Sequence, residues 1–79
     1  MQQQKDKPRA RVISGRLIEI DKKNHRILVE YKDGLNLIPE TFSTQDWDDE
    51  DYEQLRAYLD KDIKVHAQDH EVSDWEPSK

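Results

Sequence analysis

The chain of 79 residues contains no cysteine. This absence excludes disulfide staples, a thiolate nucleophile and the common cysteine-ligated zinc sites. No apolar run approaches the roughly 20 residues that a membrane-spanning helix needs, and residues 1–7 are polar where a signal peptide would carry an apolar centre. We therefore expect a cytoplasmic protein without a membrane partner, whose fold is stabilised by packing alone.

Apolar residues and glycine are also scarce. Hydrophobic residues make up 33% of the chain against 39% charged residues, and the mean hydropathy is -1.18, so the core must be small. A chain of this length folds as a single domain. Its two glycines are too few for a phosphate-cradling loop, and no serine lies in a glycine-flanked elbow. We expect a non-enzymatic protein with no cofactor and no small-molecule substrate.

The charges are divided unevenly along the chain. Residues 1–34 carry nine Lys and Arg against five Asp and Glu, a net of +4. Residues 35–79 carry four Lys and Arg against thirteen Asp and Glu, a net of -9. This division predicts one mildly basic and one strongly acidic surface, which bears on the choice of partner.

The first predicted strand covers residues 9–20, which are rich in β-branched side chains. Its apolar positions change phase, since Val12 and Ile20 are even-numbered whereas Leu17 is odd-numbered. A flat strand has a constant period of two, so this pattern predicts a long, bent strand with a bulge near Gly15.

A β-hairpin is predicted next. Residues 25–32 alternate apolar and charged side chains, as a half-buried strand does. Asp33 and Gly34 supply the positive φ values of a two-residue primed turn, so residues 35–38 form the returning strand. Pro39 ends that strand or confines it to a sheet edge, because proline donates no backbone hydrogen bond.

A helix is predicted after the hairpin. Asp48 is a suitable N-cap, and Trp47 just before it would pack on Tyr52 as a hydrophobic staple. The helix would run to Leu59, because Tyr52, Leu55 and Leu59 form one apolar stripe at helical spacing.

Two further strands complete the expected elements. Ile63, Val65 and Ala67 alternate with polar residues and predict a fourth strand. Beyond it only Val72 and Trp75 are apolar, so a fifth strand is a weaker prediction.

The expected domain organisation is a single small β-barrel over residues 9–76, between disordered tails at 1–8 and 77–79. The fold class is mainly β with one helix, in the order strand, strand, strand, helix, strand and a fifth strand. This is the order of an OB-type five-stranded barrel. An SH3-like barrel and an open α+β sheet are the alternatives.

No metal site is predicted. His66 and His70 share one face of a strand but would stand about 13 Å apart, too far for one ion. The acids that begin at Asp46 resemble a calcium loop, but the sixth and twelfth positions hold Asp51 and Ala57 where an EF-hand needs glycine and glutamate.

The most distinctive feature is a run of six acids between residues 46 and 53. Carboxylates favour the first turn of a helix, but a cap needs only one or two of them. The excess, interleaved with aromatic rings, predicts a surface that contacts a basic protein partner or a second copy of the chain. The candidate contact residues are Trp47, Asp48, Asp49, Glu50, Asp51 and Trp75.

The alternative function is binding of single-stranded RNA or DNA by the basic face of the first three strands. Two observations weigh against it: Tyr31, the one aromatic residue there, shares its phase with core positions, and the acidic second half would repel a polyanion. The candidate phosphate contacts are Arg9, Arg11, Arg16, Lys22, Lys23, Arg26 and Lys32.

Overall fold

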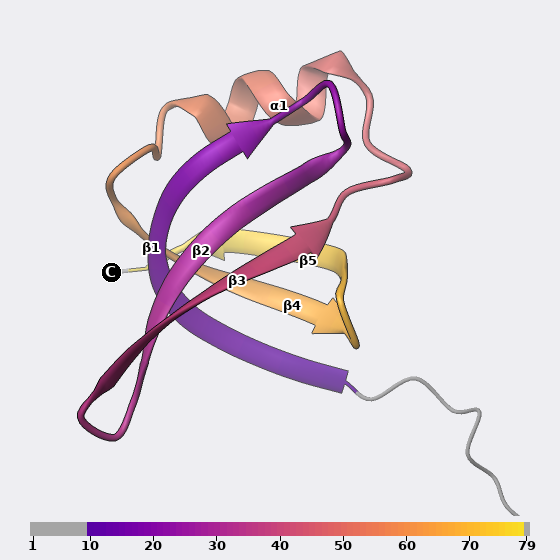
Figure 1. Cartoon of the computed structure of the whole chain (residues 1–79). Helices are drawn as coiled ribbons and strands as arrows, with labels where there is room; N and C mark the ends of the chain where they lie inside the picture. Colours follow the sequence, from indigo (N-terminus) through magenta and orange to yellow (C-terminus); the bar gives the residue numbers. More distant parts are fainter. Residues whose placement is uncertain (1–9, 79) are drawn as a thin grey trace, which may run out of the picture.

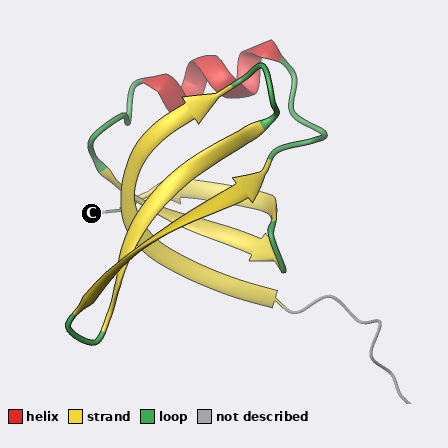
Figure 2. Cartoon of the chain, viewed as in Figure 1, coloured by secondary structure: helices red, strands yellow, loops and turns green. Residues whose placement is uncertain are grey.

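The computed structural model describes residues 10–78. Its order of elements confirms the prediction of a mainly β fold with one helix, the fifth strand included (Figures 1 and 2). Residues 1–8, expected to form a tail, lie outside the described residues. The elements are β1 (Ala10–Asp21), β2 (Arg26–Asp33), β3 (Asn36–Ser43), α1 (Asp49–Arg56), β4 (Asp62–Gln68) and β5 (Glu71–Pro77).

The five strands form one hydrogen-bonded ring in the order β1-β2-β3-β5-β4, with β4 returning to β1. All neighbours are antiparallel except β3 and β5, which meet at a single parallel pair, Ser43 and Glu71. In Figure 1, α1 lies over one end of the strands, and the β2–β3 hairpin projects from the other end. The ring is therefore continuous, but β3 and β5 are joined by one residue pair only.

The first strand closes the ring because it serves two neighbours, β4 with its first half and β2 with its second half. The expected bulge is present, but it lies between Leu17 and Glu19, so its prediction near Gly15 was wrong. The bulge changes the phase of the strand and brings Ile20 to the core side with Leu17. Gly15 has a different role: a Cβ there would collide with the carbonyl oxygen of Glu30, so glycine permits the close approach of β1 and β2.

The hairpin turn lies one residue later than expected. Asp33 pairs with Asn36, so the two loop residues are Gly34 and Leu35, and the prediction of Asp33 as a turn residue was wrong. The φ of +68° at Gly34 suits the first position of a primed turn, where a side chain would be strained. Leu35 is left fully exposed at the tip.

The third strand continues through Pro39 to Ser43, so the prediction that it ends before the proline was wrong. The prediction that Pro39 is confined to an edge is confirmed, because Pro39 pairs with Glu30 on the β2 side and β5 joins β3 only at Ser43. The missing N–H of the proline therefore costs no ladder hydrogen bond on its open side.

The start of α1 agrees with the prediction. The Asp48 carboxylate accepts a hydrogen bond from the Asp51 backbone N–H at 3.1 Å, and the Asp51 carboxylate accepts one from the Asp48 N–H at 3.0 Å. This is a reciprocal capping box. The Trp47 and Tyr52 ring centroids are 5.3 Å apart, which confirms the hydrophobic staple.

The end of α1 differs from the prediction. The helix stops at Arg56, and Leu59 is 38% exposed in the turns that follow, so its assignment to the buried stripe was wrong. The helix ends early because the chain must turn back toward the sheet to begin β4. Asp60 adopts a φ of +67° and its N–H bonds the Leu17 carbonyl at 2.8 Å, which pulls the chain out of the helical direction.

The core fills the ring beneath α1. The expected inward positions of β4 are buried, as are Ile27 and Val29 of β2, whereas Tyr31 is only half-buried; the helix adds Tyr52 and Leu55. The Tyr52 hydroxyl lies 2.6 Å from the Oγ1 of buried Thr44, which ties the helix to the end of β3. Among residues 10–78, the length and polarity of the one helix rule it out as a membrane span. The buried cluster comprises Leu17, Ile27, Val29, Phe42, Leu55, Ile63, Val65, Ala67 and Val72.

Candidate functional site

A hollow of about 400 Å³ lies between α1 and β5. The helix side contributes Trp47, Asp51 and Gln54, and the strand side contributes residues 73–75, which include Trp75. Three of the predicted protein-contact residues, Trp47, Asp51 and Trp75, are thus brought together although they come from distant parts of the sequence. We call this region, formed by residues 44–55 and 71–77, the acidic surface.

Both indoles of the acidic surface are partly buried and packed against the core. Trp47 rests on Tyr52, and Trp75 meets Tyr58 edge-on, with 5.3 Å between ring centroids in each pair. Such ring pairs are favourable beyond their buried area. Each tryptophan is therefore held in place by a tyrosine while part of its ring lines the hollow.

The remaining predicted contact residues lie at the start of α1. Asp48 and Asp51 are occupied by the capping box. Asp49 pairs with Lys22 at 3.0 Å across two exposed side chains, which is a weak, screened interaction. Glu50 is exposed and has no ion pair within the described part of the chain. Only some of the acids are therefore used by the fold.

The acidic surface contains no compensating cation of its own. Residues 44–55 carry six Asp and Glu, residues 71–77 carry three, and neither segment contains Lys or Arg. The negative potentials of neighbouring carboxylates add together, so a hollow beside them attracts cations. The rings and the charge together favour a ligand that is both cationic and partly apolar.

The predicted basic residues are distributed differently. Arg9 lies outside the described residues, and three others are held in ion pairs by nearby acids. Arg16, Lys23 and Lys32 are exposed, without an ion pair among residues 10–78. The paired cations are Arg11 with Glu40 (2.8 Å), Lys22 with Asp49 (3.0 Å) and Arg26 with Asp21 (3.3 Å).

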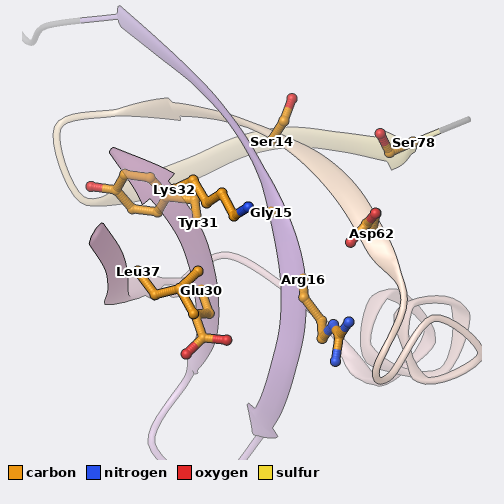
Figure 3. A pocket seen from close by; sticks show the side chains of 9 residues that line it. All are labelled: Ser14, Gly15, Arg16, Glu30, Tyr31, Lys32, Leu37, Asp62 and Ser78. Carbon is orange, nitrogen blue, oxygen red and sulfur yellow. The ribbon is translucent and has the colours of Figure 1, made fainter. Parts of the chain in front are cut away.

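A second hollow, of about 480 Å³, lies where β1 bends between β2 and β4 (Figure 3). It brings Arg16 and Lys32 together, but Glu30 and Asp62 line it as well. The Tyr31 ring points away from Arg16 in Figure 3. This hollow therefore has mixed charge and offers little aromatic surface for base stacking.

Sequence reasoning missed one polar cluster, which lies at the end of the ring opposite α1. The Arg11 guanidinium donates two hydrogen bonds to the Glu40 carboxylate, at 2.8 and 2.9 Å, and the Tyr31 hydroxyl donates a third at 2.8 Å. The Arg11 and Glu40 side chains are only 23% and 16% exposed. The one available signal was phase, because Arg11 and Tyr31 share the parity of their strands' buried residues.

This cluster controls the ionisation of its members. The hydrogen bonds from Arg11 first, and then the one from Tyr31, lower the pKa of Glu40 from 4.5 to about 2, against the opposing effect of burial. The hydrogen bond to Glu40 in turn raises the pKa of Arg11 and that of Tyr31. Glu40 is therefore a carboxylate at any ordinary pH, and its lone pairs are already engaged.

The histidines have separate partners. His66 Nε2 lies 3.0 Å from Glu76, and His70 Nδ1 lies 3.4 Å from Glu40. Within residues 10–78, no group of three His, Asp or Glu side chains is arranged to hold a metal ion.

Comparisons of this chain with protein families, curated proteins and solved structures found no match.

Proposed function

We propose that the chain is an OB-type β-barrel that acts as a non-enzymatic protein-interaction module. The order β1-β2-β3-β5-β4, with the helix between β3 and β4, supports this barrel type. The shared first strand, bent and bulged, supports it as well, because such a strand allows a small barrel to close. An SH3-like barrel is the alternative.

The proposed partner is a basic segment of another protein, bound in the cytoplasm at the acidic surface. The observation that carries the proposal is the hollow that Trp47 and Trp75 both line, together with Asp51 and Asp74 and without any Lys or Arg. Partly buried aromatic rings are typical anchors of protein interfaces, and the surrounding acids would steer a cationic segment to them.

A binding role without catalysis is further supported by the most perturbed carboxyl group. Among the described residues, Glu40 has the one pKa that is moved far from its usual value, and its oxygens are held by Arg11 and Tyr31. A general acid or base needs a proton that it can exchange with a substrate. Glu40 instead acts as a structural ion-pair partner, and we propose no catalytic residue or cofactor.

The second candidate function is binding of single-stranded nucleic acid on the outer side of β1 and β2. It is favoured by the position of Arg16 and Lys32 in one hollow, both without an ion pair among the described residues. OB-type barrels commonly bind single strands across the face of strands two and three, and this hollow is lined in part by β2 and by Leu37 of β3. It ranks second because Glu30 and Asp62 share that hollow.

Fluorescence anisotropy with two labelled probes separates the two functions. We expect a cationic peptide to bind at low salt and a single-stranded oligonucleotide not to bind. The substitutions Asp46→Asn and Glu50→Gln together should weaken peptide binding, whereas Arg16→Gln and Lys32→Gln together should leave it unchanged. Saturable oligonucleotide binding that the second pair abolishes would support the second function and exclude the first.

A further inference from the structure

Strand β5 has an open edge next to the acidic surface. One edge of β5 pairs with β4 from Glu71 to Pro77, whereas the other edge meets β3 only at the pair between Ser43 and Glu71. From Val72 onward, no described strand pairs with that second edge. Unpaired backbone N–H and C=O groups on an edge are a template for an added strand.

A groove follows this edge. The hollow that contains the two tryptophans adjoins a second one, of about 280 Å³, and Ser73 lines both. Asp46 and Glu71 line the second hollow together with Gln68 of β4. The two hollows together run from Glu71 to Trp75 between β5 and the segment that leads into α1. Five residues of a strand span about 16 Å, enough for several residues of an extended ligand.

The composition of the groove selects the occupant. Four acids, Asp46, Asp51, Glu71 and Asp74, and no Lys or Arg line the two hollows, so the groove would repel a second copy of its own β5 and attract a basic strand. The open edge of β3 is interrupted in the middle of the strand, because Pro39 lacks an N–H and Glu40 is turned inward to Arg11, whereas the proline of β5, Pro77, is its last residue. From Val72 to Glu76, every residue of β5 carries a backbone N–H; that of Trp75 donates to the Asp74 carboxylate at 2.9 Å, so an added strand would replace this bond.

We propose that a basic, extended segment of the partner adds as a strand to the open edge of β5, with one cationic side chain placed between Trp47 and Trp75. This inference rests on the function proposed above and adds the mode of binding. Main-chain hydrogen bonds to β5 would give affinity, and the aromatic hollow would select an Arg or Lys side chain at one position of the segment.

A peptide with blocked amides tests this binding mode. The probe is a capped peptide of alternating arginine and threonine, and the comparison peptide is identical except that alternate backbone amides are N-methylated. Both carry the same charge, but the second cannot form a ladder of hydrogen bonds on one side. We expect N-methylation to raise the Kd, measured by NMR titration, by about tenfold or more. The unmethylated peptide should also slow hydrogen exchange at the β5 amides.

The protein variants provide a matched control. Asp46→Asn lies beside the groove and should weaken the unmethylated peptide about two- to threefold, since it removes one screened attraction. Asp62→Asn removes an equal charge from the β1 side and should leave the Kd unchanged.

Two outcomes separate the binding mode from the proposed function. Equal Kd values for the two peptides, with shifts at both indole signals and unchanged exchange at β5, would overturn strand addition and leave the acidic surface as the binding site. Absence of binding by either peptide, or binding that leaves both indole signals unmoved, would overturn the proposed function as well. Dimerisation of the chain that the peptide competes away would assign the edge to a second copy.

Discussion

The acidic surface and the hollow between β1 and β2 differ in how their charges are used. In the second hollow Arg16 and Lys32 share the lining with Glu30 and Asp62, so the opposite charges compensate locally. The acidic surface contains no Lys or Arg. Two of its acids cap α1 and two pair with Lys22 and Arg56 outside it, but Asp46 and Glu50 have no ion pair among the described residues. Net charge alone therefore identifies no binding surface; what matters is the charge that remains after local partners are subtracted.

The largest effect is expected where opposite charges are matched inside the fold. Glu40→Gln removes the carboxylate that accepts from Arg11 and Tyr31, and it leaves a guanidinium only 23% exposed. The free energy of unfolding should fall by about 2–4 kcal/mol, measured by urea denaturation. The control Glu71→Gln, an acid of the acidic surface, should change it by less than about 0.5 kcal/mol. Equal effects of the two substitutions would remove the distinction between matched and unmatched acids.

The pH dependence of stability sharpens the same distinction. The pKa of Glu40 is lowered from 4.5 to about 2, so the unfolded chain binds more protons at this group than the folded chain between those values. The contribution is present above pH 4.5 and is lost as the pH falls toward 2, by on the order of 2 kcal/mol. Denaturation curves of Glu40→Gln should lack this loss, and a loss of the same size in the variant would assign it to other groups.

A smaller effect is expected at the helix start, where acids of the acidic surface do have partners. Asp48→Ala removes the cap of the Asp51 N–H and should cost about 1 kcal/mol. Glu50→Ala, two residues later, removes an acid without an ion pair and should cost less than half as much. Thermal unfolding followed by circular dichroism compares them, and the reverse order of the two costs would contradict the assigned capping box.

The smallest effect on stability is expected from the unmatched acids together. Asp46→Asn combined with Glu50→Gln should change the free energy of unfolding by no more than about 0.5 kcal/mol, while it weakens binding of a cationic peptide. Differential scanning calorimetry measures the change in stability, and isothermal titration calorimetry of the same sample measures peptide binding. A marked loss of stability would show that these acids stabilise the fold and are not free to bind a partner.

Much of the fold could be predicted because its signals are local. The capping box at Asp48, the staple between Trp47 and Tyr52 and the alternation in β4 each depend on residues within a few positions of one another. The predictions were wrong where contacts with residues distant in the sequence determine the local structure. The bulge lies where β1 must pass from β4 to β2, and α1 ends where Asp60 must reach Leu17.

The candidate site could be predicted only in part for the same reason. The excess of acids near Trp47 is visible in the sequence, whereas its proximity to Trp75 follows from the crossing of β5 beside α1. The pairing of Arg11 with Glu40 joins residues 29 positions apart, and no spacing rule connects them. Charges could therefore be counted from the sequence, but which of them are neutralised could not.

The most direct test of the proposed binding role is a two-dimensional NMR titration of the protein with the alternating arginine–threonine peptide. The account predicts saturable shifts at the indole N–H signals of Trp47 and Trp75, with the amides of Gly15 and Lys32 unmoved. Shifts centred on Gly15 and Lys32, with both indole signals fixed, would contradict it.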